Sequence, residues 1–201
     1  MSSIKGITTK SQMIFTQENE YSAVLDACVL VPASLCDTLL RLAEEPAMYR
    51  PLWSEQILAE LIKALRTKLH RSAADTAYRR QQMTESFPEA MVKVPPDLLK
   101  AVECIPDPND RHVLAAAIMG RANTIVTQNT KHFPKECLES FGVLCQNADD
   151  FLVHQYHLCP QLVLDKLDDQ GIGIGQDRAY VVASLRGSAA NFCRLIEEHS
   201  M

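Results

Sequence analysis

The feature that most constrains the fold of this chain is the alternation of short apolar runs with longer stretches of helical periodicity. The apolar runs have the length and composition of buried strands, and they occur at Ser22–Leu25, Tyr49–Trp53, Met91–Val94, Thr124–Thr127 and Gly142–Cys145. Between them, apolar residues recur every three or four positions, as in the helices of globular domains. Strands that alternate with helices build α/β domains. The sequence therefore predicts an α/β fold in which a parallel sheet is flanked by helices.

This pattern divides the chain into three parts. Residues 1–20 form a polar leader without periodicity, residues 21–148 hold the alternating pattern, and residues 149–201 lack any strand-like run. Helices are expected in the middle part near 33–45, 55–65, 73–87, 97–104 and 107–120, and in the last part near 149–157, 160–169 and 177–199. We therefore expect an α/β domain followed by a C-terminal all-helical extension.

Composition excludes several classes of protein. The 201 residues carry a formal net charge of −5, which argues against a protein that coats nucleic acid through its overall charge. No window is apolar enough for a membrane helix, and residues 1–20 lack the apolar core of a signal peptide, so we expect a cytoplasmic protein. The seven cysteines include no CxxC pair, which indicates neither a disulfide framework nor a zinc knuckle. We expect them to be mostly small buried residues in a reducing compartment.

One stretch departs from the acidic balance of the chain. Between positions 63 and 80, only Asp75 opposes the basic residues Lys63, Arg66, Lys68, Arg71, Arg79 and Arg80. Such a stretch is either a solvated helix face or a surface that follows the phosphates of a nucleic acid. The sequence leaves both interpretations open.

Acidic and amide side chains follow the expected strands. Asp26 ends the first strand, Asp107 and Asp110 open the helix that precedes the strand at 124–127, and Asn129 follows that strand. In parallel α/β sheets, ligands bind outside the carboxyl ends of the strands. We therefore expect these side chains to converge at one edge of the sheet, with Glu60 joining them from the inner face of its helix.

Two chemical interpretations of this cluster remain. Carboxylates about 4 Å apart repel by about 4 kcal/mol at an effective dielectric constant of 20, so a cluster of them stays ionised only around a cation, and oxygen ligands suit Mg²⁺ or Mn²⁺. The structural alternative is that Asp107 is a helix N-cap, with Pro108 at the first helical position and Asp110 at the third. The residues alone do not decide between a metal site and a helix cap.

Four stretches in this order resemble the PIN-domain ribonucleases, and specifically the VapC-type toxins of bacterial toxin–antitoxin pairs. They are Leu25–Leu30, Leu52–Glu60, Asp107–Ala117 and Ile125–Pro134. The likeness covers residues 22–148, and the helical extension is similar to one found in a branch of these toxins. The resemblance implies a parallel sheet between helices.

The resemblance also implies site residues and an activity. The first acid of the family falls on Asp26, its helical glutamate on Glu60, its third acid on Asp110 with Asp107 as a neighbour, and its later polar position on Asn129. The implied chemistry is Mg²⁺- or Mn²⁺-dependent cleavage of RNA to a 5′-phosphate and a 3′-hydroxyl, restrained by a cognate antitoxin. Two positions depart from the family, because Cys28 stands where relatives commonly have Asn and His132 where they often have Asp.

The sequence thus supports two hypotheses of different classes. In the first, the protein is a metal-dependent endoribonuclease: Asp26, Glu60 and Asp110 hold the ion and act in catalysis, and Asp107 and Asn129 support them. Lys63, Arg66, Lys68 and Arg71 would then position the RNA backbone. In the second, the same fold is a catalytically weak or inactive module that binds RNA or a protein, as the departures at positions 28 and 132 suggest. DNA or flap-structured substrates, and a homodimer, also remain open.

Overall fold

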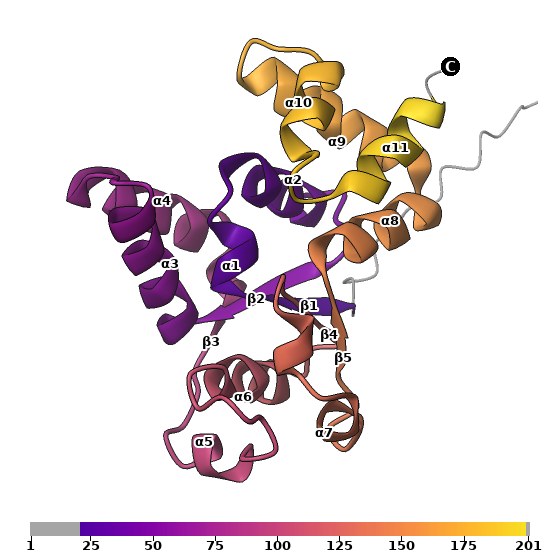
Figure 1. The fold of residues 1–201 in the computed structure, drawn as a ribbon. Coiled ribbons are helices and arrows are strands. Elements are labelled where there is room, and N and C mark those ends of the chain that lie inside the picture. The colour runs from indigo at the N-terminus through magenta and orange to yellow at the C-terminus, as the bar shows by residue number, and fades with distance from the viewer. Residues whose placement is uncertain (1–20, 200–201) are drawn as a thin grey trace, which may run out of the picture.

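The computed structural model describes residues 21–199, and the expected leader at 1–20 lies outside them. A five-stranded parallel sheet with the strand order β3-β2-β1-β4-β5 forms the centre of the molecule (Figure 1). The strands are β1 (Ser22–Leu25), β2 (Arg50–Ser54), β3 (Met91–Val92), β4 (Thr124–Val126) and β5 (Leu144–Gln146). The predicted α/β class and all five predicted strands are therefore confirmed, and no strand end differs from its predicted position by more than two residues.

β1 lies in the middle of the sheet and fixes its register. Val24 is opposite Leu52 of β2 on one side and Ile125 of β4 on the other. All four residues of β1 are buried, as expected for a parallel strand that helices cover on both faces. The carboxyl ends of β1 and β4 consequently lie side by side.

Helices cover both faces of this sheet. They are α1 (Ala27–Leu30), α2 (Ala33–Ala43), α3 (Glu55–Lys68), α4 (Ala73–Ser86), α5 (Leu98–Ala101), α6 (Arg111–Gly120), α7 (Lys135–Glu139), α8 (Ala148–Leu158), α9 (Pro160–Gly173), α10 (Arg178–Leu185) and α11 (Ala190–His199), with 3₁₀ turns at Pro88–Ala90 and Thr130–His132. In Figure 1, α6 lies below the sheet, and α2 and α8 lie above it. Ala115–Ala117 of α6 are fully buried, because their small side chains let the helix approach the strands closely.

The start of α6 corrects one prediction. Asp107 is not the N-cap of this helix, which begins at Arg111 rather than beside Pro108. The carboxylate of Asp107 instead accepts hydrogen bonds from the backbone N–H and the side-chain amide of Asn109, both at 2.9 Å. This local Asx turn competes with helix formation, which explains the later start. Asp110 occupies the N-cap position but makes no side-chain capping bond, so its carboxylate is available for other contacts.

The C-terminal extension packs directly on the α/β part. The Phe151 ring of α8 meets the Tyr49 ring edge to face at 5.0 Å, and Gln170 of α9 accepts a 2.7 Å hydrogen bond from Thr38 of α2. The helix expected over 177–199 is two helices, α10 and α11, and Asp149 accepts hydrogen bonds from Asn191 and Phe192 at the start of α11. That distant cap explains why the sequence pattern alone predicted one helix.

Phe151 is expected to anchor the extension. Its ring is fully buried against Tyr49, so Phe151→Ala should lower the free energy of unfolding by about 3–5 kcal/mol. Leu158→Ala is the matched control, because Leu158 is 73% exposed and its truncation should change stability by less than about 0.5 kcal/mol. Urea unfolding measures both. Equal stabilities of the two variants would contradict the packing described here.

The cysteines give a second correction. Cys104 and Cys137, which are 33 residues apart, form a disulfide, whereas the sequence indicated none. The prediction of small buried thiols holds for Cys36 and Cys193. The pairing was missed because it depends on the loop after α5 meeting α7, a tertiary contact that cysteine spacing does not encode. Within residues 21–199, no helix is both long and apolar enough to cross a membrane.

Candidate active site

The candidate site lies where β1 and β4 end. Asp26 directly follows β1, is 7% exposed, and its backbone N–H donates to the Val126 carbonyl at 3.1 Å. The Asp26 side chain lines a cavity of about 440 Å³, and Glu60, Asp110 and Asn129 line the same cavity. The structure therefore brings together the side chains that the strand-end pattern placed at one edge of the sheet. Their catalytic roles remain predictions.

Two donors orient the Asp26 carboxylate. The Thr127 hydroxyl donates to Asp26 Oδ2 at 2.6 Å, and the Cys28 thiol donates to the same oxygen at 3.0 Å. Burial, followed by the nearby Asp26 charge, raises the pKa of Cys28 to about 12, so the thiol stays protonated at neutral pH. The backbone N–H groups of Gln128 and Asn129 donate to the Cys28 sulfur and the Thr127 hydroxyl. Cys28 therefore supplies a hydrogen bond at this site.

Glu60 is a half-buried carboxylate close to the charges of two others. It lies on α3 beside the buried stripe, with 40% of its side chain exposed. Burial raises the pKa of Glu60 to about 7, and the charges of Asp26 and Asp110 add to this effect. Electrostatic repulsion of this kind disappears when a cation enters the cluster.

His112 is a site residue that the sequence analysis missed. Its ring is 2% exposed, and its Nδ1 lies 2.7 Å from the Asn109 carbonyl oxygen, which only accepts hydrogen bonds. Burial lowers the pKa of His112, so the ring is neutral, carries its proton on Nδ1 and presents a lone pair on Nε2. That nitrogen lies 3.5 Å from Glu60 Oε2 and has no hydrogen-bond partner among residues 21–199. In the sequence, His112 resembled any other position on the buried face of α6.

Asp110 joins the cluster to a second group of ligand-type side chains. His132 Nδ1 lies 2.8 Å from Asp110 Oδ2, and one ligand atom from each of Asp107, Asp110 and His132 lies within 4.8 Å of the others. The family departure at position 132 therefore places an imidazole, rather than a fourth carboxylate, in contact with the third acid.

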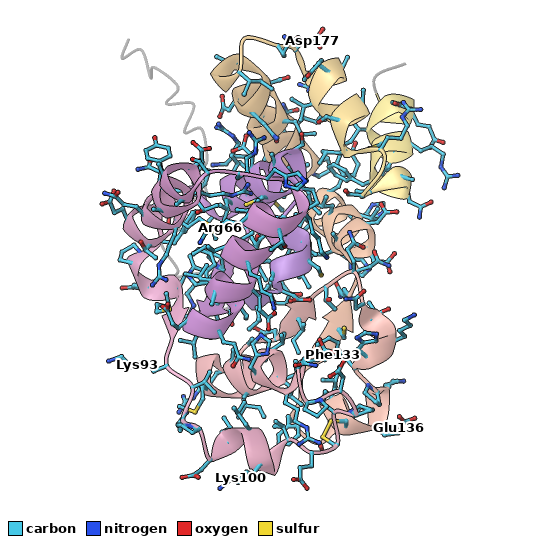
Figure 2. The ribbon with its side chains drawn as sticks, turned by 60° about the vertical axis from the view of Figure 1, so that its left-hand side comes forward. Arg66, Lys93, Lys100, Phe133, Glu136 and Asp177 are labelled. Atoms are coloured by element: carbon cyan, nitrogen blue, oxygen red, sulfur yellow. A yellow bond between two sulfur atoms is a disulfide. The ribbon has the colours of Figure 1, made fainter. Side chains whose placement is uncertain are left out.

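The basic stretch divides into two parts with different surroundings. Lys63 and Lys68 of α3 line the cavity together with the carboxylates, whereas Arg66 is exposed and does not line it; Figure 2 labels Arg66. Arg79 donates to the Leu30 carbonyl, and Arg80 pairs with Glu55. The second half of the stretch thus serves the packing of α4, and the first half is free to meet a ligand. Arg71, also exposed, follows α3 and does not line the cavity.

The side chains at the cavity fit a hard divalent cation. Asp26, Glu60 and Asp110 supply carboxylate oxygens, which are the ligands that Mg²⁺ and Mn²⁺ prefer. The observation that supports the fit is geometric: Asp110, which lines the cavity with Asp26 and Glu60, offers a ligand atom within 4.8 Å of ligand atoms of Asp107 and His132. Bound there, a divalent cation would lower the pKa of a coordinated water and neutralise charge on a phosphate.

Comparison with known proteins agrees with this geometry. The PIN domain model matches residues 22–131, which contain Asp26, Glu60 and Asp110. A segment of 49 residues is 51% identical to the putative ribonuclease VapC50 of Mycobacterium tuberculosis (strain ATCC 25618 / H37Rv). That segment is 24% of this chain and 29% of the mycobacterial protein, so the match spans less than a third of that relative. Because the PIN model covers more than half of the 201 residues, the chain belongs to the PIN-domain family.

Proposed function

We propose that this protein is a Mg²⁺- or Mn²⁺-dependent endoribonuclease that acts as the toxin of a type II toxin–antitoxin pair. The observation that carries the proposal is the single cavity that Asp26, Glu60 and Asp110 line together with Lys63 and Lys68. The carboxylates suit a cation, and the ammonium groups suit a phosphodiester. The name of the mycobacterial relative supports the ribonuclease class.

Each of these side chains has its own role in the proposed reaction. Asp26 and Asp110 hold the cation, and the hydrogen bonds from Cys28 and Thr127 keep Asp26 in place. Glu60 helps to hold the cation or accepts a proton from the attacking water, a task that suits a carboxylate whose pKa is about 7. Asp107 and Asn129 support these ligands. In-line attack then leaves a 5′-phosphate and a 3′-hydroxyl.

The RNA backbone is proposed to run along α3. Lys63 and Lys68 contact the phosphates nearest the cavity, and Arg66 and Arg71 contact phosphates further along the strand. These contacts position the substrate without reading its bases.

Neutralising the two lysines at the cavity tests this path. Lys63→Ala/Lys68→Ala should weaken RNA binding and reduce the slope of log K against log salt by about 1.4, because each phosphate contact to a single strand contributes about 0.7. Lys100→Ala is the matched control, since Lys100 is exposed on α5 (Figure 2). Fluorescence anisotropy at several salt concentrations measures both variants. An unchanged slope in the double variant would place the RNA elsewhere.

Cleavage of RNA by the purified protein tests the activity itself. Added Mn²⁺ should start cleavage, and a chelator should stop it. RNA binding without metal-dependent cleavage would instead favour a weak or inactive binding module, the alternative that Cys28 and His132 suggest. The hydrogen bond from Cys28 to Asp26 favours the active enzyme, because it shows that this departure still supplies a donor to the first acid.

The biological role has its own test. As a toxin, the protein acts in the cytoplasm, residues 21–148 form its catalytic unit, and residues 149–201 form an extension with a separate role. Expression should arrest growth, and co-expression of a small protein encoded just upstream should relieve the arrest. Size-exclusion chromatography of the chain alone detects a homodimer, and chromatography with that protein added detects the complex. If expression does not arrest growth, the toxin assignment is wrong, whereas the nuclease assignment is unaffected.

A further inference from the structure

The Cys104–Cys137 disulfide encloses one half of the candidate metal site. It joins the loop after α5 to α7, with the two Cα atoms 5.6 Å apart. The enclosed segment, residues 105–136, contains Asp107, Asp110 and His132, whereas Asp26 and Glu60 lie outside it. The crosslink, a yellow bond in Figure 2, therefore closes the loop that carries one set of ligand-type side chains and leaves the other set outside that loop.

The same two segments meet at a second point, inside the site. Asp110 follows the loop that carries Cys104, and His132 precedes the helix that carries Cys137. Their side chains are joined by the 2.8 Å contact between Asp110 Oδ2 and His132 Nδ1. A covalent bond at one end of this pair of segments thus limits how far apart the two side chains at the other end can move.

Without the crosslink, the loop has modest support. α5 contains no buried residue, and the Asp107 carboxylate is held within the loop by Asn109. The loop is anchored by the buried side chains of Val102 and Ile105, by the bond from Arg111 Nε to the Ile105 carbonyl at 3.1 Å, and by the 2.7 Å contact between His112 Nδ1 and the Asn109 carbonyl oxygen. These contacts keep the loop folded and leave its carboxylates freer to move than the crosslinked form does.

We propose that this disulfide is a reversible redox site that sets the affinity of the metal site, with cellular thiols or dithiols as its reductant. Cys104 is exposed and Cys137 is buried, so a thiolate attacks the sulfur of Cys104. The mixed disulfide forms there, and Cys137 leaves as a thiolate that takes up a proton. A second thiol of the reductant attacks the mixed disulfide, which releases the Cys104 thiol and oxidises the reductant to its disulfide. Two electrons pass to the protein, and a disulfide oxidant reverses the exchange.

The affinity of a metal site depends on the groups that hold its ligands in position. Loss of a group that positions a ligand typically costs tenfold to a hundredfold in metal affinity. The disulfide acts through Asp110 and its neighbours and not by direct contact, so we expect the smaller effect. Reduction should weaken Mn²⁺ binding by about tenfold. In a reducing compartment, disulfides are rare, and those that form are usually transient and serve in redox sensing or catalysis, which suits such a role.

This inference deepens the proposed function and rests on its metal site, so the test reads metal binding directly. The Kd for Mn²⁺ is measured on oxidised protein and on protein reduced with a phosphine and desalted, with circular dichroism to confirm the fold. We expect the Kd for Mn²⁺ to be about tenfold higher after reduction. Cys104→Ser/Cys137→Ser should show the weaker Kd under both conditions, and Cys159→Ser, which removes an exposed free thiol, should respond as the unmodified protein does.

Two results would overturn the inference: an unchanged Kd on reduction, or free thiols at Cys104 and Cys137 in a peptide map of the oxidised protein. The reduced unmodified protein keeps the test valid if the double variant does not fold. RNA cleavage measured on the same samples separates the two proposals. A shift in Kd without cleavage in either state would contradict only the nuclease. Cleavage with equal Kd values would contradict only the redox site.

Discussion

Asp110→Asn and Asp26→Asn are each expected to reduce Mn²⁺-dependent RNA cleavage by at least about 10²–10³-fold, the range found when one group that stabilises developing charge is removed. Both carboxylates line the same cavity, and an amide has the shape of a carboxylate without its charge. The loss should therefore reflect the missing charge and not a change of packing. Initial rates of cleavage of a fluorescent RNA at saturating Mn²⁺ measure it.

Asp97→Asn is the matched control for this prediction. The Asp97 side chain is 94% exposed and pairs with Lys100 on α5, so its charge should not matter to cleavage. Thermal unfolding shows whether each variant keeps the fold. Folded Asp110→Asn protein with cleavage near that of the control would remove Asp110 from the proposed mechanism.

Glu60→Gln is expected to have two opposite effects, a loss of cleavage of about 10²-fold or more and a gain of stability for the metal-free protein. The pKa of Glu60 is raised from 4.5 to about 7 by burial and by the charges of Asp26 and Asp110. A carboxyl with a raised folded-state pKa contributes stability that is fully present below pH 4.5 and is lost as the pH rises through about 7. A glutamine does not titrate, so the variant keeps the stability that the unmodified protein loses as the pH rises.

The measurement compares melting temperatures in chelator at pH 5 and pH 8. The melting temperature of Glu60→Gln minus that of the unmodified protein should be larger at pH 8 than at pH 5. At pH 8, Mn²⁺ should raise the melting temperature of the unmodified protein more than that of the variant. Glu89→Gln, at an exposed position, serves as the control. A difference that does not depend on pH would contradict the raised pKa of Glu60.

The sequence predicted much of the fold and of the cavity because both depend on local patterns. Short apolar runs identify buried strands, and the residue that follows a parallel strand lies at the carboxyl edge of the sheet. Asp26 and Asn129 were placed by that rule alone, and Glu60 by its position beside the buried stripe of α3. The family likeness then supported Asp110 over a purely structural role.

The features that the sequence did not reveal depend on contacts between distant segments. Asp107 was predicted as a cap, but its bond to Asn109 replaced a helical turn. His112 has the spacing of a core residue, and only its distance to Glu60 gives it a place in the site. Likewise, the Thr127 hydroxyl supports Asp26 only because β1 and β4 are neighbours in the sheet. Each of these requires the tertiary structure.

The central claim is that this cavity cleaves RNA with a divalent cation, and a Mn²⁺ titration of the chelator-treated protein tests it most directly. Cleavage of a single-stranded RNA should be absent without metal, rise with Mn²⁺ to a plateau, and leave 5′-phosphate and 3′-hydroxyl ends. Cleavage that continues in excess chelator, or RNA that stays bound and intact at saturating Mn²⁺, would contradict the account.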